Sequence, residues 1–253
     1  MKKIFTLVSI AAVVCACNKN EMAPVATGYG HIEISGISND ETVATKAVQT
    51  VEDFSTWTVK VGDVVYTGSA QKFTAGTYTV TASNYADEAT ANAAYSGWGA
   101  AFYTGSKGDV EVVAGITTNV EIACGTAKNA RLAVVFNTAT FGTFITEYSV
   151  NVAKAGVADG LVFNGENAAT KKAYFAAGTA DVAYTIAYKY NGVPKEANGT
   201  VTLGTAATEK KITISANNNG TITVTITYDD TFGDGGEETF DIDAATGEQV
   251  VSG

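Results

Sequence analysis

The sequence predicts an all-β protein built from two tandem antiparallel β-sandwich domains. β-Branched and aromatic residues alternate with polar ones over many short runs, as in half-buried strands. Turn residues separate the runs, including Asn-Gly pairs at 191–192, 198–199 and 219–220 that suit type I′ hairpin turns. The pattern F-x-A-G-T-x-x-V begins at Phe73 and again at Phe175. This spacing of about one domain length favours two related domains over a single barrel.

The chain opens with a segment typical of exported lipoproteins. Lys2 and Lys3 precede a short apolar run, Ile4 to Val14, and Ala16 stands directly before Cys17. This is the layout of a secretory signal peptide, and the cysteine makes it resemble the lipobox of bacterial lipoproteins. A transmembrane helix is the weaker interpretation, because spanning a bilayer takes about 20 apolar residues. A simple secreted protein is the other alternative.

Of the two cysteines in this segment, Cys17 is the better lipidation site. It has Val14 at the third preceding position and a small residue directly before it, whereas modification of Cys15 would require cleavage after the branched Val14. With Cys15 removed and Cys17 acylated, Cys124 is left without a partner for an intramolecular disulfide. Because Cys124 alternates with Val120 and Ile122, we expect it to be a small buried hydrophobe rather than a reactive thiol.

The composition suits an exported β protein and argues against nucleic-acid binding. Of the 253 residues, 46% are hydrophobic, which is enough for real cores, and 17% are charged. The formal net charge is −10, and Arg131 is the single arginine. Such an acidic chain cannot easily neutralise phosphates, so we expect no nucleic-acid partner. The excess of carboxylates is more simply explained by solubility.

The first half of the mature chain is predicted to form one sandwich with a short helical insertion. An Ala-rich stretch predicts a helix over 86–95, capped by Ser83 or Asn84, with Asp87 and Glu88 in its first turn. Alternating apolar residues predict the strands around it, at 30–38, 54–61, 64–66, 73–82, 109–113 and 117–124.

The second half shows the same pattern of predicted strands after a domain boundary placed at 125–129. Residues 139–145 are expected to form one or two helical turns. Strands are predicted at 131–136, 147–152, 161–163, 172–175, 182–190, 198–203, 209–215 and 221–228, and a last hairpin at 238–243 and 248–251. The predicted segments are therefore a signal peptide (1–16), a lipidated tether (17–27), an N-terminal β-sandwich domain (28–125) and a C-terminal β-sandwich domain (126–253).

The residues needed for common catalytic sites are not grouped in the sequence. A hydrolase triad needs a base, usually histidine, beside a nucleophile, and the one histidine, His31, lies on the polar side of the first predicted strand. There is no G-x-S-x-G motif, no cluster of His and Cys suited to zinc, and no Gly-rich phosphate loop that opens a helix. We therefore expect a protein that is not an enzyme and uses no cofactor.

An acidic cluster at 229–238 is a weak calcium candidate. Calcium favours several oxygen ligands on a flexible loop, and Asp230, Asp234 and Glu237 could supply them. However, Phe232 occupies a position where an EF-hand loop starting at Asp230 needs a carboxylate. A solvated hairpin loop is the preferred interpretation.

Aromatic residues around a Gly-rich loop form the best candidate for a recognition surface. Tyr95 and Trp98 are followed closely by Phe102 and Tyr103. Aromatic side chains on loops can stack on sugar rings or anchor a partner protein, so Trp98, Tyr95 and Tyr103 are the candidate contact residues. The alternative, that these side chains plug the open end of a sandwich, is somewhat favoured.

Several short motifs occur in an order that resembles a known family. They are the lipobox, Gly28-Tyr29-Gly30, Thr45-Lys46-Ala47, Asp53-Phe54, Ala75-Gly76-Thr77-Tyr78-Thr79-Val80 and Lys172-Ala173-Tyr174-Phe175. Together they resemble an uncharacterised family of Bacteroidetes lipoproteins, catalogued as a domain of unknown function, that is similar to the fimbrillin superfamily. The resemblance runs to about Phe175. It implies a pair of transthyretin-like β-sandwich domains on an outer-membrane lipoprotein with a role in surface structures or adhesion.

The sequence differs from the fimbrillin superfamily in one respect. Shaft subunits of the fimbrillin superfamily are similar in being cleaved after an arginine near the N-terminus, which frees a groove for a neighbour's strand. Here no arginine precedes Arg131, which itself opens a predicted strand. This difference favours an anchor, a tip or a stand-alone adhesin over a polymerising shaft subunit.

The sequence therefore predicts a cell-surface structural or adhesive lipoprotein, held in the outer membrane by a lipid on Cys17. Expected partners are other fimbrial subunits or a host or glycan ligand. The rival prediction is a glycan-binding outer-membrane lipoprotein associated with nutrient uptake, in which Trp98 and Tyr103 stack on sugar rings.

Overall fold

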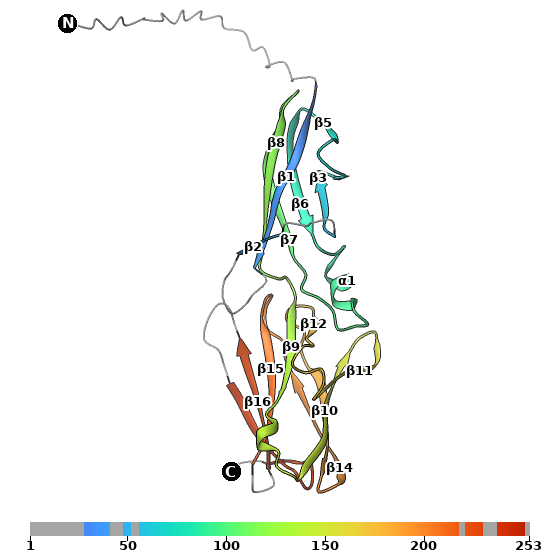
Figure 1. The fold of residues 1–253 in the computed structure, drawn as a ribbon, viewed down its shortest axis with the longest axis vertical. Helices are drawn as coiled ribbons and strands as arrows, with labels where there is room; N and C mark the ends of the chain where they lie inside the picture. Colours follow the sequence, from blue (N-terminus) through green and yellow to red (C-terminus); the bar gives the residue numbers. More distant parts are fainter. Residues whose placement is uncertain (1–27, 41–47, 52–55, 218–220, 230–236, 251–253) are drawn as a thin grey trace, which may run out of the picture.

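The computed structural model describes residues 28–40, 48–51, 56–217, 221–229 and 237–250 and confirms the all-β prediction. The molecule is elongated, with the first strand starting at one end of its long axis (Figure 1). Within the described residues, its single α-helix, α1 (Glu88–Ala93), lies beside the middle of that axis.

The upper half in Figure 1 is a sandwich of two four-stranded sheets. In one sheet β1 pairs antiparallel with β2 and β5 and parallel with β8; the other has the order β4-β3-β6-β7. Alternate residues of the strands face inward, so Ile32, Val80 and Ile122 are fully buried between the sheets. The strands are β1 (Tyr29–Asp40), β2 (Val48–Val51), β3 (Thr58–Val61), β4 (Val64–Val65), β5 (Lys72–Thr74), β6 (Gly76–Ser83), β7 (Thr104–Val112) and β8 (Thr117–Gly125).

The lower half is a second sandwich with its own hydrophobic core. One sheet has the order β11-β10-β13-β14 and the other β12-β9-β15-β16-β17-β18. Leu132, Phe163 and Ile212 are among the completely buried residues between them. The strands are β9 (Ala130–Phe136), β10 (Ile145–Lys154), β11 (Val157–Asn164), β12 (Ala173–Phe175), β13 (Val182–Tyr190), β14 (Val193–Val201), β15 (Glu209–Ala216), β16 (Thr221–Asp229), β17 (Glu237–Asp243) and β18 (Gln249–Val250).

The two sandwiches repeat one strand arrangement. The first strand of each, β1 or β9, pairs antiparallel with a short strand, β5 or β12, and parallel with a later strand, β8 or β15. The repeated sequence pattern falls at the same place in both. Phe73 on β5 and Phe175 on β12 are buried, and an Ala-Gly turn after each leads into β6 or β13. The sequence repeat therefore marks corresponding positions in two copies of one supersecondary arrangement.

The predicted helix is shorter than expected and begins at a different cap. Asp87 is the N-cap, and its carboxylate accepts a hydrogen bond from the Thr90 amide at 2.7 Å. The prediction of a cap at Ser83 or Asn84 was wrong because both residues are used elsewhere. Ser83 ends β6, and the Asn84 side chain accepts from the Tyr103 amide and donates to the Ala101 carbonyl, each at 2.8 Å.

The three Asn-Gly pairs have different outcomes. Residues 191–192 form the predicted hairpin turn between β13 and β14, with φ of 50° and 79°. The turn predicted at 198–199 was wrong, because both residues lie inside β14. A Cβ on Gly199 would lie 2.4 Å from the Tyr184 hydroxyl oxygen, so the glycine makes room for that ring. The pair at 219–220 lies outside the described residues.

Other boundaries moved by a few residues. β7 starts at Thr104, before the predicted 109, and β11 covers all of Val157–Asn164 rather than three residues. Only a 3₁₀ turn, η1 (Thr138–Thr140), forms in the region predicted to be helical at 139–145. The expected last hairpin is present as β17 and β18. As predicted, Cys124 is buried, with 2% of its surface exposed.

Candidate functional site at the junction of the two sandwiches

The segment after α1 reaches from the first sandwich into the second. The Trp98 ring packs edge-to-face against Phe163, with 4.9 Å between ring centroids, and the Trp98 carbonyl accepts a hydrogen bond from the Tyr174 amide at 2.8 Å. The Lys171 ammonium lies 5.6 Å from the Trp98 ring centroid. A Cβ on Gly97 would come within 2.3 Å of Val157, so only glycine fits at this point.

Lys154, the last residue of β10, ties the two sandwiches together. Its ammonium donates to three backbone carbonyls, those of Asn92, Gly97 and Tyr174, and lies 4.9 Å from the centroid of the Phe175 ring. Burial lowers the pKa of Lys154 to about 8, so the ammonium form still predominates at pH 7. One side chain thus uses all its donors to join three separate chain segments.

Asn129 fixes the connection between the sandwiches. Its amide nitrogen donates to the Asn92 side chain and to the Ala100 carbonyl, each at 2.8 Å, and its side-chain oxygen accepts from the Phe102 amide at 3.0 Å. Its backbone carbonyl accepts from the Ala207 amide at 3.0 Å. Asn129 is 2% exposed, so its buried side chain is satisfied by the first half while its backbone carbonyl bonds to the second.

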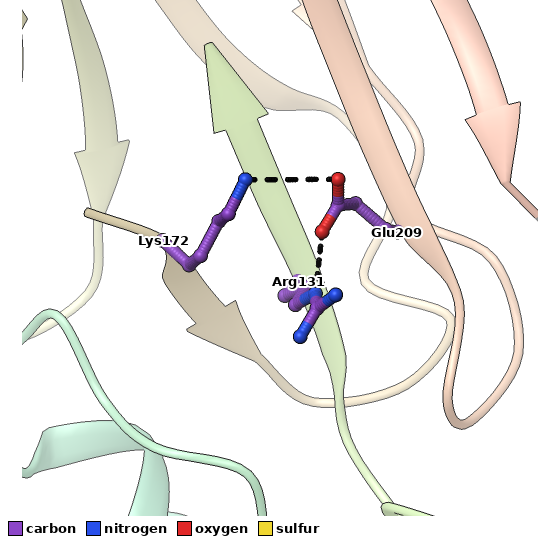
Figure 2. Close-up of polar contacts among 3 residues, drawn as sticks. All are labelled: Arg131, Lys172 and Glu209. Carbon is purple, nitrogen blue, oxygen red and sulfur yellow. Dashed lines mark hydrogen bonds and ion pairs between the residues drawn. The ribbon is translucent and has the colours of Figure 1, made fainter. Parts of the chain in front are cut away.

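A small ion cluster joins Arg131 on β9, Lys172 just before β12 and Glu209 on β15 (Figure 2). The Arg131 Nε atom lies 2.5 Å from one oxygen of Glu209, and the Lys172 Nζ atom lies 3.7 Å from the other. Burial alone would lower the pKa of Arg131, but Glu209 and the hydroxyl of Tyr174 raise it above its ordinary value. The buried carboxylate is therefore held between two cations.

Tyr174 pairs with Arg131 across β12 and β9, and we call Tyr174 and its neighbours Tyr85 and Tyr95 the tyrosine surface. Tyr95 and Tyr174 are both near enough to Tyr85 to act on its hydroxyl electrostatically. Burial, followed by the neighbouring Tyr95 hydroxyl, raises the pKa of Tyr85 to about 12. Tyr95 is 69% exposed, whereas Tyr85 and Tyr174 are half-buried.

An open groove of about 900 Å³ adjoins the junction. Lys154 and Phe175 contribute to its lining, and Asn151, Asp159 and Asp181 supply polar groups. Small side chains from the β10–β11 hairpin and the start of β13 complete the surface. The groove has no exposed aromatic ring, so its chemistry differs from that of the tyrosine surface.

The predicted contact residues are separated by the fold. Tyr95 is on the surface, Trp98 packs against the second core, and Tyr103 is 5% exposed within the first core, which leaves little of its ring for a ligand. The sequence interpretation missed Tyr85 and Tyr174, because they come from distant segments that only the junction brings together. No local sequence signal marks them.

The remaining predicted sites fall at or beyond the edge of what the structure describes. Cys17, Asp230 and Asp234 lie outside the described residues, and Glu237 begins β17. In the described part of the chain, no three His, Cys, Asp or Glu side chains are grouped to hold a metal ion. His31 lies on β1, with its Nδ1 atom 3.1 Å from the Ser69 carbonyl oxygen. No helix among the described residues is long and apolar enough to cross a membrane.

Comparison with protein families identifies the chain. The profile of a family described as a domain of unknown function (DUF4493) matches residues 30–244. The chain belongs to the DUF4493 family. This match confirms the expected resemblance to an uncharacterised family, and it extends well past Phe175, where the sequence motifs ended. No protein with a curated description matches the chain.

Two solved structures resemble this DUF4493 protein. A candidate cell adhesion protein from Bacteroides ovatus aligns over 79% of this chain and 96% of its own, with 10% identity and a TM-score of 0.42. A candidate cell adhesion protein from Bacteroides fragilis aligns over 84% of this chain and 91% of its own, with 9% identity and a TM-score of 0.30. At these values the likeness carries no conclusion about function.

Proposed function

We propose that this DUF4493 protein is a lipid-anchored structural or adhesive protein of the outer-membrane surface. The lipidation site is Cys17, and residues 17–27 are the tether. The elongated arrangement in Figure 1 carries the proposal, because β1 begins at one end of the molecule and the second sandwich lies at the other. A body tethered at one end projects its far sandwich away from the membrane.

The junction supports this role because it resists bending. Inter-domain contacts in many proteins are small and polar, and relative motion is then the default. Here Lys154 and Asn129 connect backbone groups of both halves, and Trp98 packs into the second core. A stiff body suits a protein that holds a contact surface at a fixed distance from a membrane.

Within the fimbrillin likeness, an anchor, a tip or a stand-alone adhesin fits better than a shaft subunit. A shaft subunit that polymerises after cleavage needs an accessible arginine. Arg131 lies within β9, paired with β12 on one side and β15 on the other. Its backbone is therefore paired on both sides within the sheet, and a protease cannot bind to it.

The rival function is glycan binding beside a nutrient importer. It shares the lipid anchor and the surface location, and the exposed ring of Tyr95 favours it as a second candidate. Neither function involves catalysis, and we propose that the protein is not an enzyme. Immunogold labelling of cells distinguishes the two: labelled filaments or filament bases support the structural role, and scattered patches that coincide with an importer support the rival.

Lipidation is tested by feeding cells an alkyne-bearing fatty acid and detecting it on the protein. We expect labelling of the unmodified protein and of Cys15→Ser, and no labelling of Cys17→Ser. Protease added to intact cells should degrade the lipidated protein if it faces outward. Label on Cys17→Ser would contradict the anchor assignment, and resistance on intact cells with loss after lysis would contradict surface exposure.

A further inference from the structure

We propose that the end of the first sandwich at which β1 starts inserts into the lipid surface that anchors the protein. The residues that make this contact are Tyr29, Val113 and Ile116, which we call the apolar tip. The inference rests on the proposed lipid anchor, because it states how the anchored body meets its membrane.

Backbone hydrogen bonds hold the residues of the apolar tip together. The Gly115 amide donates to the Tyr29 carbonyl at 2.9 Å, and the Ile116 amide donates to the Val113 carbonyl at 3.1 Å. The Ile116 carbonyl in turn accepts from the His31 amide at 2.9 Å. The start of β1 and the turn between β7 and β8 therefore form one unit.

Glycines allow these two segments to approach each other closely. A Cβ on Gly28 would lie 2.5 Å from the Cβ of Ala114, and a Cβ on Gly30 would lie 2.3 Å from the Val113 carbonyl oxygen. Gly115 has φ of 77°, a conformation that favours glycine in the turn. The backbone of the apolar tip is therefore closely packed and presents its side chains at defined positions.

The side chains of the apolar tip are nevertheless exposed to solvent. Exposed fractions are 63% for Tyr29, 53% for Ile116 and 37% for Val113. Single exposed apolar residues are ordinary on a protein surface, whereas neighbouring ones mark interaction sites.

The end of the sandwich around the apolar tip also carries no charge. Three segments meet there through strand pairing, at 28–30, 73–77 and 112–118, and none of them contains a charged residue. Burying a charge is costly, so its absence lets this end leave water at little cost.

The position of the apolar tip next to the proposed anchor selects a lipid surface as its partner. β1 starts at one end of the long axis, and β8 runs parallel to β1, so the turn before β8 lies at that same end (Figure 1). Eleven residues, 18–28, separate Cys17 from Tyr29. Even a fully extended chain of this length spans only about 40 Å. An acylated Cys17 therefore keeps the apolar tip beside the membrane.

A lipid interface suits these three side chains. Tyrosine is enriched at membrane interfaces, where its ring reaches apolar surroundings while its hydroxyl stays wet. Aliphatic side chains gain free energy on leaving water. The tether makes the contact effectively intramolecular, so a small apolar surface is enough. Because the end is uncharged, we expect insertion into neutral lipid.

The apolar tip is too small for a stable interface with another protein. A completely buried tyrosine contributes about 150–250 Å², and valine and isoleucine are smaller. Three partly exposed side chains therefore offer less than the roughly 800 Å² per partner that a stable protein interface buries.

The test measures quenching of tryptophan fluorescence by phosphatidylcholine with brominated acyl chains. The mature chain, residues 17–253, is coupled through the Cys17 thiol to a maleimide lipid in the vesicles, while Cys124 is buried and does not couple. Tyr29→Trp places a probe at the apolar tip. The matched control is Tyr95→Trp, because Tyr95 is 69% exposed but follows α1 near the middle of the molecule (Figure 1).

After subtraction of the signal of the unmodified protein, brominated lipid should reduce the fluorescence of Tyr29→Trp by about twofold, since tryptophan settles at the interface. The fluorescence of Tyr95→Trp should not change. Adding Val113→Asp and Ile116→Asp to Tyr29→Trp should abolish quenching, because carboxylates resist transfer out of water. A thermal melt establishes that each variant is folded, and Ile116→Ser gives a second readout should the aspartate variant melt early.

The proposal is overturned if Tyr29→Trp is not quenched, if Tyr95→Trp is quenched equally, or if quenching survives the aspartate substitutions. The uncoupled chain should sediment as a monomer. A dimer that the aspartate substitutions dissociate would assign the apolar tip to a second copy of the chain and would also overturn the proposal. Because a synthetic lipid replaces the natural one, failure here leaves lipidation of Cys17 in cells to its own test.

Discussion

The ammonium group of Lys154, at the end of β10, donates a hydrogen bond to the carbonyl of Gly97 in the opposite sandwich. The same group also bonds the carbonyls of Asn92 and Tyr174. The Asn92 carbonyl lies in α1, the Gly97 carbonyl in the loop after it, and the Tyr174 carbonyl on β12. A single side chain therefore fixes how these three elements meet. The arrangement of the two sandwiches therefore depends strongly on one residue.

Replacing Lys154 with methionine should loosen the junction. The thioether fills similar space but donates no hydrogen bond, and each buried carbonyl left without a partner costs about 1–3 kcal/mol. Because water can reach some of these carbonyls, we expect a total loss of about 2–4 kcal/mol in the free energy of unfolding. Guanidinium denaturation measures this loss. Lys107→Met, at an exposed site on β7, is the control and should change stability by less than about 0.5 kcal/mol.

Gly97→Ala should be more damaging than a comparable change at Gly156. Both glycines have positive φ, 89° and 81°, so alanine is strained at either position. A Cβ at position 97 would also meet Val157 at 2.3 Å, whereas position 156 has open space. We expect about 1 kcal/mol of destabilisation for Gly156→Ala and about 2–4 kcal/mol for Gly97→Ala, measured by thermal or chemical unfolding. Equal effects would show that the contact with Val157 is unimportant.

Cys124 should be almost unreactive in the folded protein. Burial raises the pKa of its thiol from 9.0 to about 11, so very little thiolate is present at pH 8. Alkylation by iodoacetamide at pH 8 should be at least 100-fold slower in the native chain than in guanidinium. The unfolded thiol ionises at lower pH, so the contribution of Cys124 to stability should fall as pH rises from about 9 toward 11. Rapid native alkylation would contradict its burial.

Arg131 provides a protease test with a simple readout. Because it is the single arginine, an arginine-specific protease produces either the intact chain or two fragments. Pairing of the Arg131 backbone with β12 and β15 should protect the native protein from cleavage. The Lys154→Met variant should be cleaved faster if opening of the junction also frees β12. Gel electrophoresis over time measures both rates. Fast cleavage of the unmodified native chain would contradict the preference for an anchor, a tip or a stand-alone adhesin over a processed shaft subunit.

The parts of the fold set by local pattern could be predicted from the sequence. Alternation of apolar and polar residues identified strands that turn one face toward the core of their own sandwich. The predicted hairpin at 191–192 also formed, because its turn requires two residues with positive φ. The turn expected at 198–199 failed for a tertiary reason: Gly199 accommodates the Tyr184 ring in the middle of a strand. A two-residue motif does not distinguish a turn from close packing.

The candidate site could be predicted only in part. Tyr95 was identified from its loop, but its neighbours Tyr85 and Tyr174 are brought to it by a junction that depends on Lys154 and Asn129. Tyr103, grouped with Tyr95 by sequence proximity, lies just before β7 and is buried in the first core, where its backbone amide and carbonyl bond to Asn84. Contacts between distant segments carry no periodic signal.

The central claim is that the junction holds the two sandwiches in one fixed arrangement. Its most direct test is a spin-label distance measurement on residues 18–253 with Cys124→Ala, which leaves no native cysteine. Labels at the exposed positions Glu33 and Thr200 report across the junction, and labels at Asp159 and Thr200 report within the second sandwich. We predict one narrow distance peak for both pairs, with Lys154→Met broadening only the pair that spans the junction. A distribution across the unmodified junction that is much broader than the one within the sandwich would contradict the claim.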